Sequence, residues 1–127
     1  MKSKALTTVE KMFAAFGSGD LEKFRETVSE DTTWIYYGTK EIPKETFEGK
    51  DGATTFLRNI LTQTEMLSFE PQQFICEGNM VVVLGQEHQR VKATGKELKQ
   101  KWVQVYTVEN NLITRMEEFA ASEVVNQ

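Results

Sequence analysis

Four strand-like segments in the second half of the chain constrain its fold more than any other feature. These segments span residues 69–77, 80–90, 98–108 and 112–119. Short turns separate them, at Gly78-Asn79, around Gly95 and at Asn110-Asn111. Short connections favour antiparallel pairing between neighbouring strands. The second half therefore predicts an antiparallel meander.

Apolar residues in the first half recur at helical spacing and predict three helices. The first helix ends at Gly17-Ser18-Gly19, and Asp20 is expected to cap a second, shorter helix. Asp51 is the expected N-cap of the third. The residues expected to point inward are Leu6, Val9, Phe13 and Phe16 in the first helix, Leu21, Phe24 and Val28 in the second, and Phe56, Leu57, Ile60 and Leu61 in the third.

One more strand is expected before the third helix. Residues 32–37 are rich in β-branched and aromatic side chains and end at Gly38, whereas residues 40–49, with Pro43, predict a looser connection. A chain with helices gathered in its first half and strands gathered in its second half is typical of an α+β fold, in which the helices cover one face of an antiparallel sheet. A chain of 127 residues is expected to form one domain, residues 1–127.

Composition limits the classes of partner. The net charge is −4 and the 15 basic residues are scattered, which argues against a nucleic-acid-binding face. No segment approaches the roughly 18 apolar residues that span a bilayer. With one cysteine no internal disulfide can form, and residues 1–4 do not resemble the start of a signal peptide. A cytoplasmic protein that binds neither nucleic acid nor membrane is expected.

Alternation along the last two strands assigns side chains to faces. Trp102, Gln104, Tyr106 and Val108 share one face of their strand, and Met116 and Glu118 share one face of the next. Val103, Val105 and Phe119 fall on the opposite faces, so both faces carry apolar groups. If helices cover one face, the outer face is expected to meet a second subunit, which predicts a homodimer.

The order of these segments resembles the nuclear transport factor 2-like superfamily, in particular its SnoaL-like and ketosteroid-isomerase-related branch. The resemblance covers nearly the whole chain, and the stretches that carry it are residues 16–21, 31–34, 47–52, 69–71, 77–85, 93–96 and 102–108. It implies a cone-shaped, cystatin-like roll: three N-terminal helices packed on a strongly curved, mainly antiparallel sheet. A pocket opens at the wide end, and dimers form through the sheet. The superfamily includes isomerases, cyclases, hydrolases and non-catalytic binding modules, so residues must decide the function.

The resemblance implies a pocket for a small, largely apolar organic molecule. The expected catalytic residues are Glu118 and Tyr36: a carboxyl among apolar side chains has a raised pKa and suits proton transfer. The expected ligand-binding residues are Trp34, Phe56, Trp102, Gln104, Tyr106 and Met116. Two alternatives remain open, since aromatic rings can simply fill a core and a buried Glu can be a structural partner of Arg or Tyr. The protein would then be a non-catalytic binding module or a dimerisation domain with a filled cone.

The family's usual catalytic positions hold other residues here. The resemblance matches the general-base aspartate of ketosteroid isomerases to Tyr36, their oxyanion tyrosine to Met12 and their protonated aspartate to Gln104. An aspartate common in the SnoaL-like branch is replaced by Ala121. Steroid isomerisation by that machinery is therefore not expected.

The remaining reactive side chains give no cofactor or metal site. His88, the only histidine, is expected to face solvent or form a hydrogen bond. Cys76 is expected in the core as a small apolar residue. No ligand spacing supports a metal, and no phosphate-loop glycine pattern is present, so no cofactor is expected.

Overall fold

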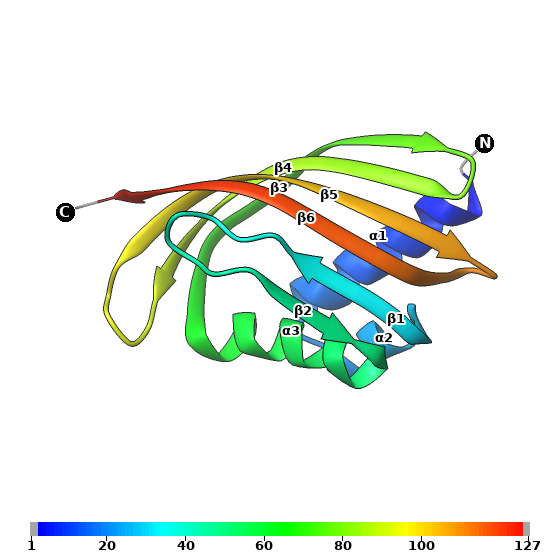
Figure 1. Cartoon of the computed structure of the whole chain (residues 1–127), viewed down its shortest axis with the longest axis horizontal. Helices are drawn as coiled ribbons and strands as arrows, with labels where there is room; N and C mark the ends of the chain where they lie inside the picture. Colours follow the sequence, from blue (N-terminus) through cyan, green and yellow to red (C-terminus); the bar gives the residue numbers. More distant parts are fainter. Residues whose placement is uncertain (1–2, 126–127) are drawn as a thin grey trace.

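A computed structural model describes residues 3–125 and shows helices packed against one curved sheet (Figure 1). The helices are α1 (Lys4–Ser18), α2 (Leu21–Arg25) and α3 (Gly49–Gln63). The strands are β1 (Val28–Tyr36), β2 (Glu45–Glu48), β3 (Thr64–Glu77), β4 (Met80–Val91), β5 (Glu97–Glu109) and β6 (Leu112–Val125). The α+β class expected from the sequence is confirmed.

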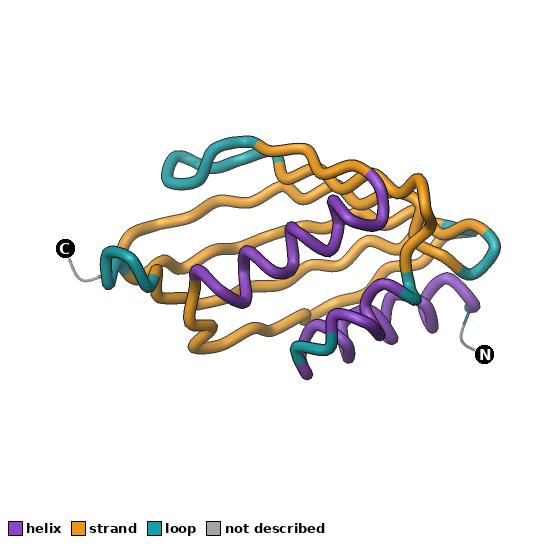
Figure 2. Tube along the Cα trace, turned by 90° about the horizontal axis from the view of Figure 1, so that it is seen from below, coloured by secondary structure: helices purple, strands orange, loops and turns teal. Residues whose placement is uncertain are grey.

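The sheet has the strand order β2-β1-β6-β5-β4-β3. Strands β3 to β6 form the expected antiparallel meander, and β2 is antiparallel to β1. Strand β1 instead runs parallel to β6, so a strand from the first half of the chain pairs with the last strand. All three helices lie on the same side of the bent sheet, and α1 and α3 cross its concave face (Figures 1 and 2). Within residues 3–125, the other face carries no helix (Figure 1).

Capping residues define the ends of the first two helices, and the break at residues 17–19 and the Asp20 cap were expected from the sequence. The Ser3 side chain accepts a hydrogen bond from Leu6 N, which caps the start of α1. Gly19 ends this helix with a φ of 68°, a left-handed conformation that favours glycine. Asp20 caps α2 by accepting from Lys23 N. The chain can therefore turn sharply between the two helices.

The third helix corrects several expectations. Its N-cap is Glu48, without a side-chain cap, while Asp51 lies in the first turn and pairs with Arg25 at 2.8 Å. Leu61, expected to be buried, is 36% exposed, because the helix packs on β1 through a different stripe. Part of the expected loop 40–49 is strand β2, because residues 45–48 pair in register with β1. Val28 belongs to β1, not to the second helix, although it is buried as expected.

An aromatic core lies between α1 and the sheet. The Trp102 ring stacks on Phe13 and Phe69 at centroid distances of 6.4 and 5.3 Å. Gly85 makes room for this ring, since a Cβ there would lie 2.4 Å from two Trp102 ring atoms. Cys76 was expected in this core, but it is exposed, because it lies on the edge strand β3, near the turn to β4.

The outer face of the sheet carries an apolar stripe made of two adjacent rows, one of which ends at Gln73 and the other at Glu117. The strand register aligns Ile75 with Val82, Val82 with Val105, Leu84 with Val103, and Val103 with Phe119. Ile75 and Phe119 are each 48% exposed. The same alternation places Trp102, Gln104 and Tyr106 inside, as expected. In the described residues, no helix is both long and apolar enough to cross a membrane.

Candidate functional site

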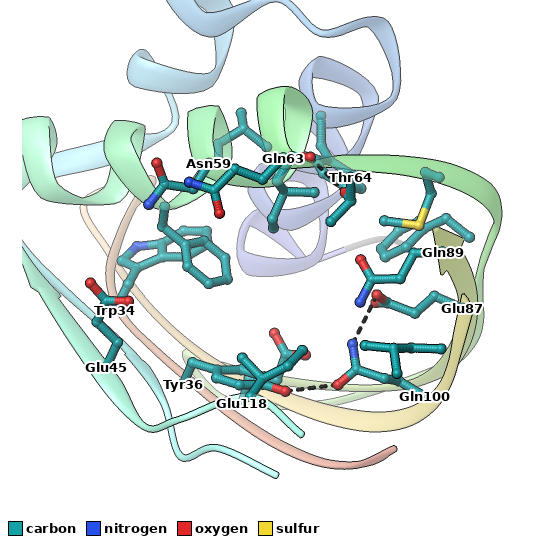
Figure 3. Close-up of a pocket in the computed structure, with 18 of the residues that line it drawn as sticks. Trp34, Tyr36, Glu45, Asn59, Gln63, Thr64, Glu87, Gln89, Gln100 and Glu118 are labelled. Carbon is teal, nitrogen blue, oxygen red and sulfur yellow. Dashed lines mark hydrogen bonds between the residues drawn. The ribbon is translucent and has the colours of Figure 1, made fainter. Parts of the chain in front are cut away.

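A cavity of about 420 Å³ opens between α3 and the concave face of the sheet. Figure 3 shows polar side chains from β1, β4, β5 and β6 on one wall and residues of α3 on the other. The aromatic side chains that line it include Trp34, Tyr36, Phe56, Phe69 and Tyr106. Trp34 lies 5.7 Å from the Phe56 ring and 6.0 Å from the Tyr106 ring. The wall is therefore mainly apolar, with a few polar groups converging on it.

Glu118 reaches this cavity from β6 and is 5% exposed. Its Oε1 accepts a hydrogen bond from Gln104 Nε2 at 3.0 Å. Gln104 in turn accepts at Oε1 from the Tyr106 hydroxyl at 2.6 Å. Since a tyrosine hydroxyl here donates to the amide oxygen, the amide nitrogen is oriented toward the carboxylate.

Glu87 is the centre of a second arrangement of the same kind. Its Oε2 accepts from Gln100 Nε2 at 3.0 Å, and Gln100 Oε1 accepts from the Tyr36 hydroxyl at 2.7 Å (Figure 3). Gln100 and Gln104 lie four residues apart on β5, and both point inward to the cavity. The cavity thus contains two carboxyl groups, each held by a glutamine that a tyrosine orients.

Both carboxyl groups bind their protons more tightly than a free glutamate. Burial and, as a smaller effect, the charge of Glu87 raise the pKa of Glu118 to about 8, against the lowering effect of the Gln104 hydrogen bond. Burial likewise raises the pKa of Glu87 to about 7, while the hydrogen bond from Gln100 lowers it. Near neutral pH, Glu118 is mainly protonated and Glu87 is close to half ionised.

The tyrosines act as hydrogen-bond donors, not bases. Burial and then the charge of Glu118 raise the pKa of Tyr36 well above its ordinary value. The same two causes raise the pKa of Tyr106. Both hydroxyls therefore keep their protons, and the acid–base capacity of the cavity lies in the glutamates.

The structure brings most of the expected site residues together. Trp34, Tyr36, Phe56, Gln104, Tyr106 and Glu118 line the cavity. Trp102 and Met116, expected to bind ligand, are packed behind its wall with 2% and 0% exposure. They share the inner face but lie deeper, where α1 covers the sheet. Glu87 and Gln100 were missed, although the period of two places Gln100 on the face of Gln104.

Two other residues lie away from this cavity. His88 Nε2 lies 2.8 Å from Glu97 Oε1, so the expectation of a hydrogen-bonded histidine is confirmed. Ala121 pairs with Lys101 and does not line the cavity. Among residues 3–125, no group of three or more His, Cys, Asp or Glu side chains is arranged to hold a metal ion.

The fold and cavity define a nuclear transport factor 2-like cone, and similar solved structures agree. An NTF2-like protein from Burkholderia xenovorans LB400 is 28% identical with a TM-score of 0.82, covering 92% of this chain and 88% of that one. An NTF2-like protein of unknown function from Burkholderia pseudomallei K96243 is 27% identical with a TM-score of 0.78, covering 93% and 91%. TerC, co-crystallised with polyporic acid, is 25% identical with a TM-score of 0.75, covering 92% and 91%.

The sequence itself identifies the family. The family model for the SnoaL-like domain matches residues 9–116. The chain therefore belongs to the SnoaL-like domain family. No curated protein sequence matches it significantly.

Proposed function

We propose that this SnoaL-like protein binds a small, largely apolar organic molecule in its aromatic cavity and transfers a proton to or from it. The observation that carries the proposal is the Glu118 carboxyl, which is buried at the cavity wall and oriented by Gln104. A general acid or base is most effective when its pKa lies near the working pH. Burial raises the pKa of Glu118 to about 8, which is close to a neutral working pH.

The geometry assigns a role to each polar group. Gln104 occupies one oxygen of Glu118, which leaves the other to exchange a proton with a ligand. Trp34 and Phe56 offer ring faces to its apolar part. Tyr36 and Gln100 lie on the same wall and can orient a ligand oxygen or nitrogen. TerC, with the same fold, was co-crystallised with a small organic molecule, polyporic acid, which also supports a binding role.

Proton transfer can be tested before the natural substrate is known. Small ketones that stabilise the protein thermally would be incubated with it in D₂O, and deuterium at the carbon next to the carbonyl would be followed by NMR. We expect exchange with the wild type and loss of at least about tenfold in rate with Glu118→Gln. The control is Glu117→Gln, since this neighbour faces the opposite side and accepts from the Tyr37 hydroxyl at 2.6 Å.

A non-catalytic binding module is the second candidate. It is favoured by Met12 and Ala121 at positions where the resemblance expects catalytic residues. Ligands would then stabilise the protein by binding the native state, with no exchange above the buffer rate in any variant. Exchange that depends on Glu118 would exclude this candidate.

The apolar stripe on the outer face supports a homodimer as a further part of the proposal. Its members come from four adjacent strands, and the helices leave it uncovered. Contiguous exposed apolar surface of this kind is typical of protein–protein contacts. A second copy of the sheet would bury it without closing the cavity, which opens on the other face.

A further inference from the structure

The charged side chains of the cavity are nearly all acidic. The ionisable residues that line it are Glu41, Glu45, Glu87, Glu118, Lys96, Tyr36 and Tyr106. Lys96, the only cation among them, is exposed on the turn between β4 and β5. Within residues 3–125, neither Glu87 nor Glu118 forms a salt bridge. The two carboxyl groups therefore have amide donors but no positive partner.

In each of these carboxyl groups, one oxygen accepts a hydrogen bond from a glutamine and the other has no donor within residues 3–125. Gln104 occupies Glu118 Oε1, and Gln100 occupies Glu87 Oε2. In the described residues, the one fully buried side-chain polar atom without a partner is Trp102 Nε1. Glu118 Oε2 and Glu87 Oε1 accept no hydrogen bond from a donor within residues 3–125, and both side chains line the cavity.

Gln89 gives an independent indication of a polar ligand. It lies two residues after Glu87 on β4, is 5% exposed and lines the same cavity. Figure 3 shows its amide pointing into the cavity beside Glu87. No hydrogen bond of this amide is formed within the described part of the chain, although buried amides are normally paired. Its carbonyl oxygen adds a third acceptor for a ligand with several donor hydrogens.

We propose that the ligand of this cavity carries a protonated amine, which binds to Glu87 and Glu118 while its apolar part lies against Trp34 and Phe56. The inference rests on the proposed function of the cavity and names the class of molecule that it takes. A buried carboxylate is costly unless a cation or several donors offset its charge. An ammonium group supplies both, and the faces of tryptophan and phenylalanine rings also attract cations.

Proton release is a direct consequence of this arrangement. Without ligand the two carboxyl groups together hold more than one proton at neutral pH, since burial raises the pKa of each. An ammonium group between them favours the ionised carboxylates. Binding therefore releases protons to the buffer, and affinity increases as pH rises toward 8.

The experiment compares three probes of similar shape: 2-phenylethylamine, 2-phenylethanol and phenylacetate. Isothermal titration calorimetry in two buffers of different ionisation enthalpy gives the affinity and the number of protons released. We expect the amine to bind at least about tenfold more tightly than the alcohol, with proton release, and phenylacetate to bind most weakly. Glu87→Gln and Glu118→Gln should each weaken the amine about tenfold and leave the alcohol nearly unchanged, whereas Glu117→Gln should change neither.

The outcomes separate the two proposals. Equal or tighter binding of the alcohol, or amine binding that both cavity variants leave unchanged, would overturn the amine inference while leaving a binding cavity. Failure of all three probes to bind would also overturn the amine inference. The deuterium-exchange assay would then test the proposed proton transfer independently. Circular dichroism of each variant verifies that a lost affinity does not reflect unfolding.

Discussion

Gln104 connects Tyr106 to Glu118, with 2.6 Å between the tyrosine hydroxyl and the amide oxygen and 3.0 Å between the amide nitrogen and the carboxylate. Gln104 and Glu118 are directly paired across β5 and β6, so the sheet register itself sets this contact. A core position that could hold an apolar side chain instead holds an amide whose two ends are both used. The Gln104 amide therefore orients the Glu118 carboxyl group in addition to filling space in the core.

This relationship predicts unequal costs for two substitutions. Gln104→Leu leaves both the Tyr106 hydroxyl and a Glu118 oxygen without partners, so we expect the free energy of unfolding to fall by about 2–4 kcal/mol. Tyr106→Phe leaves only one acceptor unpaired and should cost about 1–2 kcal/mol. Urea unfolding of both variants measures the difference. Equal losses would mean that the hydrogen bond to Glu118 contributes nothing.

Stability should fall as pH rises from about 5 to about 9. The pKa of Glu118 is raised from 4.5 to about 8 in the folded state, so its contribution is fully present below 4.5 and is lost as pH rises through 8. Glu87, with a pKa raised to about 7, acts in the same direction. We expect a decrease on the order of a few kcal/mol in the free energy of unfolding.

Glu118→Gln tests that pH dependence, because the amide has no charge to bury. The variant should show a flatter profile than the wild type and should exceed its stability at about pH 9. Glu123, which is exposed on the same strand, offers the control substitution Glu123→Gln. A wild-type profile that rises between pH 5 and 9 would contradict the raised pKa values.

Gly85→Ala should be among the most damaging small substitutions. The added Cβ would lie 2.4 Å from the Trp102 ring and 2.7 Å from Glu70 O, so the core must shift. We expect a loss of about 2–4 kcal/mol in unfolding free energy. Gly17→Ala is the matched control: it lies in α1 with open space around its Cβ position, and it should stabilise the protein by up to about 1 kcal/mol.

Phe119→Asp should convert a dimer into monomers. Phe119 is 48% exposed on the outer stripe, where a charge would have to be desolvated against a second subunit. Leu61→Asp introduces the same charge on α3, on the other side of the sheet, and should leave the assembly unchanged. Light scattering after size-exclusion chromatography gives the mass of each variant. A monomeric wild type would rule out the homodimer at the concentrations tested.

The sequence predicted the helices, the meander and the inward direction of Glu118 because each depends on a local pattern. Alternation assigns faces along β5, and along β6 beyond the irregularity opposite Thr107 and Val108, whatever the rest of the chain does. Glycine and aspartate at 17–20 mark the break between α1 and α2 because those residues favour caps and left-handed turns. Such local patterns can be recognised in a single sequence without knowledge of the fold.

Depth within a face could not be predicted in the same way. Trp102 and Tyr106 share a face, but the rings of Phe13 and Phe69 cover Trp102 and separate it from the cavity, which Tyr106 reaches. Glu87 lies in the polar run Gln86-Glu87-His88, which by itself indicates an exposed hairpin arm. Only the bend of the sheet brings this residue to the cavity that also contains Glu118. Curvature is a property of the assembled strands, and no local pattern in the run indicates it.

The parallel pairing of β1 with β6 has a consequence for how the protein is made. Contacts such as the hydrogen bond from the Thr32 hydroxyl to Ile113 O join residues 81 positions apart. While the ribosome still holds the last strand, β1 lacks this neighbour and Glu118 has no place in the cavity. The cavity can therefore be completed only after the residues of β6 have emerged. Long-range contacts of this kind slow folding. We therefore expect the N-terminal helices to reach their final packing only after β6 has been synthesised.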